Sequence, residues 1–450
     1  MANAAKNKHL QELILDDQGI KNIHFFNGRI LTAEDLKTEQ NTNRQQREQL
    51  GQAIGTGIVN GLKVDLVADG SDGSPPVVAV KAGLALNRKG QAVALSADVE
   101  LALARQQEPL PVEAGLFGEC SPPKTGAIPR DRGAYILIAT PTSGFRELAP
   151  ARGFSDGKVI SCNSRYAVEG VKFRLEELKI TELTKLSQAT RKEILELMTK
   201  SDMASLSKLR NWLAHICFGT EEMNEFLRDP FARIGSKSPY TSYGAINALH
   251  ASGQLTDCDM PLALLYWTPT GIQFLDMWSV RRPLTPVGEK NAFASLIDEH
   301  RLAVRQAMLQ QFQDQIADLA PPNSTLGTKT AQIYFRYLPS VGIIPLAEET
   351  RISDAQATRF FNGMTYRSPV FVNATRLEKL LRESLGYPPI DIQSGEMVWL
   401  YRVREYKMAI DFANSDTLSQ LYLVFASGHL SYIGDAQYDL AHWNYGNYAI

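Results

Sequence analysis

The chain has 450 residues, of which 44% are hydrophobic and 21% charged, and a formal net charge of −2. These values are typical of a soluble globular protein with about two to four domains. The near-neutral charge excludes the basic surface that nucleic-acid binding requires. No apolar run is long enough to cross a bilayer and no signal peptide is recognisable, so we expect no direct membrane insertion and a cytoplasmic location.

The first predicted element is a helix without an apolar stripe. Phe25 and Phe26, followed by Asn27-Gly28, indicate a short apolar anchor and a turn. Thr32 and Asp35 have the spacing of a capping box, which predicts a helix from residue 33 to about residue 50. Residues 37–49 include no aliphatic or aromatic side chain. Such a helix is either solvated or covered by a partner.

Six residues of this helix recur at alternating spacings of four and three, as in a heptad seam: Leu36, Gln40, Asn43, Arg47, Leu50 and Ile54. We refer to these six as the seam. Apolar ends with amides between them can set the register between like helices. Because a coiled coil calls for about three to four heptads, a solvated helix and a partner-facing helix both remain open. Glycines at 51, 55, 57 and 61 are expected to allow close backbone approach and a turn into a strand.

The remaining chain predicts an α+β fold in four parts. An N-terminal polar helical arm (1–61) precedes a β-rich domain (62–180), in which 135–139 is a buried strand. A helical region with a hairpin follows (181–290), with a helix over 243–255 and a turn at 269–271. The last part (291–450) is a mixed helical region with further strands. Its long helix covers 292–319, a second helix covers 375–385, and strands lie near 398–403 and 420–426.

Residues with catalytic or ligand-binding chemistry are sparse. The chain has no G-x-S-x-G, Walker or H-E-x-x-H motif, and its four cysteines are widely spaced, so we expect reduced thiols, no metal, no cofactor and no enzymatic activity. Asp257 and Asp259 could form a carboxylate pair, but capping a turn is the favoured interpretation. Arg281 and Arg282 could contact an anionic partner, although neighbours in a strand point to opposite faces.

The end of the chain is rich in aromatic residues. His429, Asp435, Asp439 and His442 lie in sequence close to Tyr432, Tyr438, Trp443, Tyr445 and Tyr448. Carboxylates beside aromatic platforms are a feature of sugar-binding sites, so a receptor- or glycan-binding module is the alternative function. A packed terminal hairpin is the structural explanation for the same residues.

Four short motifs stand out along the chain: F-F-N-G-R-x-L-T-x-x-D-L-x-x-E-Q from residue 25, G-I-V-N-G-L-K-V from residue 57, C-N-S-R-Y from residue 162 and T-D-C-D from residue 256. Together they resemble a family of largely uncharacterised proteins encoded with contractile injection systems and phage-tail-like particles. The resemblance implies a structural, baseplate-associated component that acts through protein-protein contacts. It also implies other particle subunits as partners, and we expect self-association through the polar helix.

Overall fold

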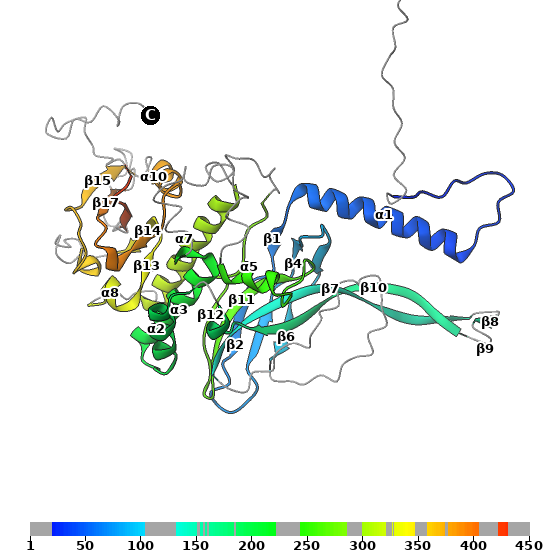
Figure 1. Cartoon of the computed structure of the whole chain (residues 1–450), viewed down its shortest axis with the longest axis horizontal. Helices are drawn as coiled ribbons and strands as arrows, with labels where there is room; N and C mark the ends of the chain where they lie inside the picture. The colour runs from blue at the N-terminus through cyan, green and yellow to red at the C-terminus, as the bar shows by residue number, and fades with distance from the viewer. Residues whose placement is uncertain are drawn as a thin grey trace, which may run out of the picture.

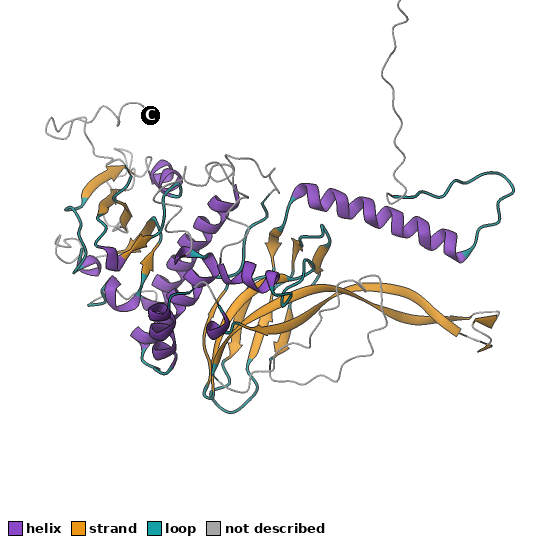
Figure 2. Ribbon diagram, in the orientation of Figure 1, coloured by secondary structure: helices purple, strands orange, loops and turns teal. Residues whose placement is uncertain are grey.

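The computed structural model describes residues 20–103, 132–150, 154–155, 158–159, 162–183, 186–221, 244–285, 299–320, 326, 328–346, 358–373, 377–404 and 422–430. Helices and mainly antiparallel sheets are mixed along these ranges, which confirms the α+β class (Figure 2). The molecule is elongated. A C-terminal sheet lies at one end, a central body follows, and one helix and one β-ribbon project from the other end (Figure 1).

The N-terminal helix leads into two small antiparallel sheets. Helix α1 (Ala33–Ile54) is followed by sheet β1-β4-β5 and sheet β2-β3-β6. Their strands are β1 (Gly57–Gly61), β2 (Val64–Ala68), β3 (Val77–Val80), β4 (Gly83–Leu86), β5 (Ala92–Leu95) and β6 (Val99–Ala102). Val78, Val80 and Val93 are fully buried between these strands and the central sheet.

A four-stranded central sheet, in the order β10-β7-β11-β12, forms the middle layer. Its strands are β7 (Gly133–Pro150), β10 (Cys162–Glu177), β11 (Met260–Thr268) and β12 (Gly271–Asp276). Successive side chains of a strand point to opposite faces. Ile136 and Ile138 therefore pack against helices, whereas Leu137 and Ala139 pack against the small β-sheets. Burial on both faces confirms the predicted strand at 135–139 and explains its unbroken apolar sequence.

Helices cover one face of the central sheet and connect it to the C-terminal unit. They are α2 (Gln188–Met198), α3 (Met203–Phe218), α5 (Gly244–Ala251) and α7 (Glu299–Leu319). Arg210 of α3 forms a buried ion pair with Asp276 of β12 at 2.7 Å. Gln311 of α7 donates a hydrogen bond to the same Asp276 at 3.1 Å. This polar contact joins the central sheet, α3 and α7.

The C-terminal unit is a four-stranded sheet, β14-β18-β17-β15, packed on α7. Phe312 of α7 contacts Phe335 and Phe425 in its aromatic core. Its other elements are α8 (Ala331–Tyr334), β13 (Tyr337–Leu338), β14 (Val341–Pro345), β15 (Val370–Asn373), α10 (Leu377–Ser384), β16 (Ile390–Asp391), β17 (Val398–Arg404) and β18 (Tyr422–Ser427). Two short strands, β8 (Phe154–Ser155) and β9 (Lys158–Val159), pair near the ribbon tip.

Most elements lie where the sequence predicts them, with shifted ends. The hairpin with its turn before Gly271, the helix near 377–384 and the strands near 398–404 and 422–427 are confirmed. The helix predicted over 243–255 ends earlier, at Ala251. Residues 292–298 of the predicted long helix lie outside the described ranges. The division into four parts stays a prediction.

The expectation of reduced thiols is wrong for Cys258, which is disulfide-bonded. Cys217 is free and buried at the end of α3. Burial raises the pKa of its thiol to about 12. Within the described ranges, no helix combines the length and apolarity needed to span a bilayer.

Candidate assembly interface

Helix α1 begins with the predicted capping box. The Asp35 amide donates to Thr32 Oγ1 at 3.1 Å, and the Thr32 amide donates to Asp35 Oδ2 at 3.0 Å. These hydrogen bonds lower the pKa of the Asp35 carboxyl, and the guanidinium of Arg29 at 2.6 Å adds to the effect. The turn at Gly28, which has φ +90°, is also confirmed. The first turn of the helix is therefore specified locally.

The base of α1 is held against the β4–β5 turn by two glycines. A Cβ on Gly51 would lie 2.1 Å from the carbonyl oxygen of Gly90, so only glycine allows this approach. Next to it, Gln91 Nε2 donates to Glu48 Oε1 at 3.1 Å, and Gln52 Nε2 donates to the Lys89 carbonyl at 3.1 Å. The close approach expected of the glycines is confirmed. The helix continues through Gly51 and ends at Ile54, four residues beyond the predicted end near Leu50.

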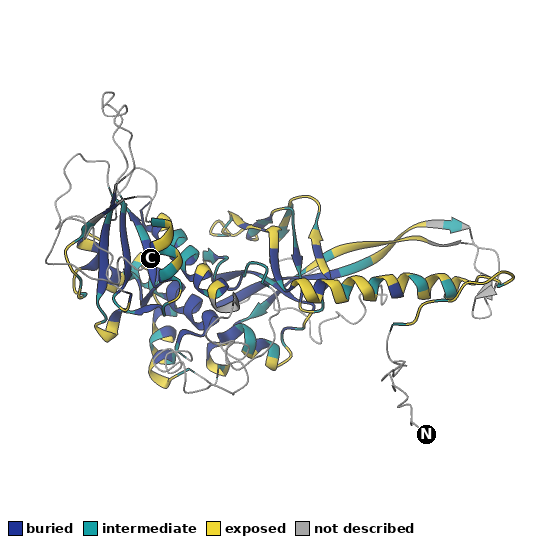
Figure 3. Ribbon diagram, turned by 90° about the horizontal axis from the view of Figure 1, so that it is seen from above, coloured by how far each residue is buried: buried dark blue, intermediate teal, exposed yellow. Residues whose placement is uncertain are grey.

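Away from its base, α1 contacts the segment that precedes it. Thr42, the one buried side chain in its middle, donates from Oγ1 to the carbonyl of Lys21 at 2.7 Å. The helix otherwise projects beyond the body (Figure 1). Most of its surface is exposed (Figure 3).

The seam lies on a face of α1 that the described part of the chain leaves uncovered. Leu36, Leu50 and Ile54 are 53%, 65% and 53% exposed, and Gln40, Asn43 and Arg47 between them are exposed as well. Asn43 donates to Glu39 of the same helix at 2.9 Å, to the carbonyl oxygen. Gln40 and Arg47 form no hydrogen bond or ion pair with another described residue. The structure thus places all six seam residues on one accessible face.

The segment before α1 adds exposed apolar side chains to the same projection. Phe25, Phe26, Ile30 and Leu31 are 51%, 59%, 85% and 52% exposed. The interpretation of Phe25 and Phe26 as an anchor is wrong for the single chain, because nothing in the described ranges buries them. Clustered exposed apolar residues are a usual mark of interaction surfaces.

The second projection is the ribbon formed by β7 and β10, which the sequence does not reveal. The two strands pair in register from Tyr135↔Glu177 to Pro150↔Cys162, whereas β11 covers only Gly133–Ala139 of β7. Beyond Thr140 the ribbon is two-stranded. Phe145, Tyr166 and Val168 on it are 51%, 46% and 44% exposed. Two-stranded ribbons are marginally stable in water on their own. The ribbon is therefore a second surface that a partner would stabilise.

The carboxylate pair does not face a common site. Asp259 is buried and receives hydrogen bonds from the Thr256 amide at 2.7 Å and from Thr140 Oγ1 at 2.6 Å, and it pairs with Arg174 at 2.8 Å. Asp257 is exposed. The turn-capping interpretation is confirmed for Asp259, which also ties β7 and β10 to the loop before β11.

Arg281 and Arg282 lie after β12 and not in a strand, which corrects the expectation of opposite strand faces. Arg281 donates to the carbonyls of Gly61 and Leu62 at 2.6 and 2.7 Å. Arg282 donates to three other backbone carbonyls, those of Trp278, Ser279 and Arg281. In the aromatic C-terminal cluster, only His429 is within the described ranges, where it is exposed. The rest of the glycan-binding alternative lies outside them.

Comparisons with known proteins add little. No family model matches the chain, and no curated protein is significantly similar to it. Among solved structures, the crystal structure of TssK is similar over 38% of this chain and 36% of that one, with 14% identity and a TM-score of 0.20. The similar part thus spans about a third of the TssK chain. A similarity of this size carries no argument about fold or function.

Proposed function

We propose that this protein is a structural subunit of a contractile injection particle, in or near its baseplate, that acts through protein-protein contacts. Two lines of reasoning support the proposal. The motifs that begin at residues 25, 57, 162 and 256 resemble a family encoded beside such particles. The molecule also extends two projections, α1 and the β7–β10 ribbon, whose apolar side chains lack cover within the described chain.

The uncovered seam of α1 carries the proposal. Apolar residues at both ends of the seam gain free energy when they leave water, at about 25 cal/mol per Å². The central amides and Arg47 restrict which partner can approach, because buried polar groups must be hydrogen-bonded. A like helix or another particle subunit with matching polar groups fits both conditions. The partners proposed are therefore other particle subunits and further copies of this chain.

The test changes the centre of the seam without changing the fold. We expect Asn43→Ala with Arg47→Ala to weaken assembly with the neighbouring tail proteins, measured by co-purification after co-expression. Lys37→Ala with Asn41→Ala is the matched control, since it removes one cation and one amide from another exposed face of α1. The control should assemble like the wild type.

Amide hydrogen exchange supplies a second readout. In the isolated chain the exposed α1 should exchange rapidly, and assembly should slow exchange over its seam-bearing turns. If the seam variant assembles normally and α1 exchanges equally fast in both states, α1 is a solvated spacer and the proposal is wrong.

A further inference from the structure

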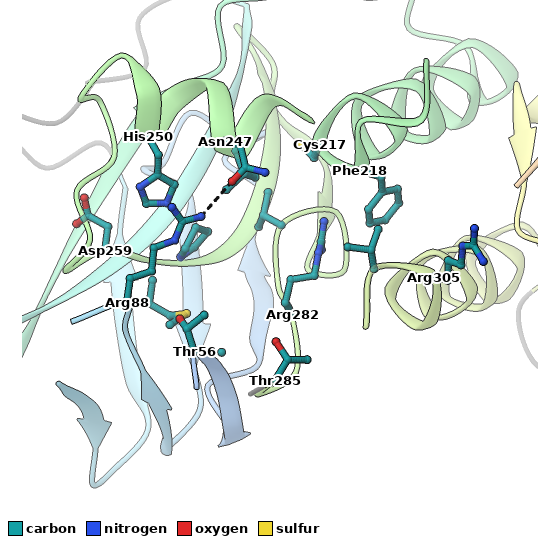
Figure 4. Close-up of a pocket in the computed structure, with 16 residues that line it drawn as sticks. Thr56, Arg88, Cys217, Phe218, Asn247, His250, Asp259, Arg282, Thr285 and Arg305 are labelled. Carbon is teal, nitrogen blue, oxygen red and sulfur yellow. Dashed lines mark hydrogen bonds between the residues drawn. The ribbon is translucent and has the colours of Figure 1, made fainter. Parts of the chain in front are cut away.

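A cavity of about 120 Å³ lies where α5, the end of α3, the start of β1 and the loop after β12 meet (Figure 4). A single water needs roughly 10–15 Å³, so the cavity can admit a group of several heavy atoms. Its lining includes three arginines and one histidine from separate elements: Arg88, Arg282, Arg305 and His250. This cavity plays no part in the proposed function.

Arg282 is held rigidly at the cavity wall. Its guanidinium donates to the carbonyls of Trp278, Ser279 and Arg281 at 2.8, 3.0 and 2.7 Å. It also lies 4.8 Å from the centre of the Phe218 ring. These contacts use three of the five N–H donors of an arginine, and no described carboxylate forms a salt bridge with it. Loss of solvent lowers the pKa of Arg282 to about 10, as expected for a cation without a direct counterion.

Arg88 reaches the cavity from the opposite side, on the β4–β5 turn. Its Nη2 donates to Oδ1 of Asn247 on α5 at 3.1 Å (Figure 4). This bond directs the guanidinium toward α5 and leaves its other N–H donors available for a ligand. His250, one turn later on α5, also lines the cavity. Desolvation, together with the charge of Arg88, lowers the pKa of His250 to about 4.

Acidic side chains near the cavity offset part of this positive charge. The carboxylate of Asp257, exposed in the loop before β11, opposes the lowering of the pKa of Arg88 and of His250. Asp259, the only acidic side chain in the lining, pairs with Arg174 at 2.8 Å and accepts hydrogen bonds from Thr140 and Thr256. Asp276, which lies near Arg282, pairs with Arg210. The C-terminus of α3 contributes only about half a negative charge. The described lining therefore keeps an excess of positive charge.

We propose that this cavity binds a small oxyanion, such as a phosphate group. Guanidinium groups bind phosphate oxygens through strong, charge-assisted hydrogen bonds, and two preordered arginines on opposite walls suit a polyvalent anion better than chloride. The hydroxyl of Thr285, which also lines the cavity, is a further donor. Bound anion would join the β4–β5 turn, α5 and the loop after β12.

The test is calorimetric titration of the full chain with inorganic phosphate at constant ionic strength, with chloride as the reference anion. We expect one saturable site per chain with a dissociation constant of about 1 mM or lower, and a higher melting temperature in phosphate. Arg88→Gln and Arg282→Gln should each weaken binding by about tenfold or more. Arg382→Gln is the matched control, because Arg382 lies on the exposed surface of α10.

Absence of saturable phosphate binding would overturn the proposal. So would equal affinities in the wild type and Arg88→Gln, or an equal loss in the Arg382→Gln control. If Arg282→Gln fails to fold because its three carbonyls lose their donor, Arg88→Gln decides alone, since Arg88 is exposed on a turn. Seam variants should bind phosphate normally, which separates this proposal from the proposed function.

Discussion

Helices α1 and α7 are nearly equal in length, at 22 and 21 residues, and both are rich in polar residues. Their surroundings differ. Only Thr42 and Gly51 are buried on α1, whereas α7 is buried along most of its length between α3 and the C-terminal sheet. The apolar side chains of α7 include Phe312 and Ile316, which are 0% and 1% exposed.

The two helices also show what buried amides require. Gln311 and Gln315 of α7 are each 1% exposed, and they donate to Asp276 at 3.1 Å and to the Ser207 carbonyl at 2.7 Å. Gln40 of α1 is exposed and forms no such bond within the described ranges. A glutamine can therefore be buried in a packed helix of this fold when its side-chain amide has a hydrogen-bond partner. Within the described ranges, Gln40 on α1 has no partner of this kind.

The largest loss of stability should come from creating a cavity in the core beside α7. Phe312→Ala should lower the free energy of unfolding by about 3–5 kcal/mol, because it removes a ring packed against Phe335 and Phe425. Urea denaturation measures the change. Leu302→Ala on the same helix, where Leu302 is 47% exposed, is the control and should change stability little. Equal losses in both variants would remove the contrast between packed and exposed positions.

Protonation of His215, on α3, should destabilise the protein at low pH. This side chain is 2% exposed, and burial, aided by Arg336, lowers its pKa from 6.5 to about 3. The unfolded chain binds the proton more tightly, so stability is present above pH 6.5 and is lost as the pH falls toward 3. The loss should be about 1.4 kcal/mol per pH unit. In His215→Gln the urea midpoint should depend less on pH; an unchanged slope would refute the assignment.

Replacing Gly51 tests how α1 is held. In Gly51→Ala the new methyl group would meet the Gly90 carbonyl oxygen at 2.1 Å, so the helix must move off the β4–β5 turn. The helix itself gains about 1 kcal/mol from alanine, so the chain should keep its fold while the base of α1 exchanges amide hydrogens faster. Gly144→Ala, at a position with open space, is the control. Unchanged exchange at residues 48–54 would contradict the predicted displacement.

The smallest effect on the single chain should come from the seam itself. Leu50→Ser should change the free energy of unfolding by less than about 0.5 kcal/mol, because its side chain is 65% exposed. Sedimentation or co-purification should instead show weaker association. A large loss of stability in the isolated chain would mean that α1 packs on its own body, and the distinction from α7 would fail.

Short sequence motifs predict the elements that are specified by residues close together in the chain. The capping box of Thr32 and Asp35, the apolar strand at 135–139 and the turn before Gly271 each act within a few residues, and the structure confirms them. The helix end near residue 50 was wrong because a glycine usually ends a helix, whereas Gly51 is accommodated by contact with Gly90.

Long-range features lay beyond sequence reasoning. The β7–β10 ribbon depends on pairing across a connection, and its outer part lacks the apolar alternation that marks a half-buried strand. The cavity is formed by residues from Thr56 to Arg305, and no spacing rule links them. The sequence places Arg281 and Arg282 side by side, but only the fold separates the roles of the two. The seam was found from its spacing, and its interface role stays a prediction.

The glycine contact at the base of α1 makes the helix a lever. Its fulcrum, where Gly51 meets Gly90, lies about 27 Å from the first turn at the helical rise per residue. A tilt of roughly 10° at this point would carry the tip sideways through about 5 Å. That displacement is about half of the roughly 8–10 Å that separates the axes of packed helices. A small movement of the β4–β5 turn would thus bring the outer seam against a neighbour or away from it.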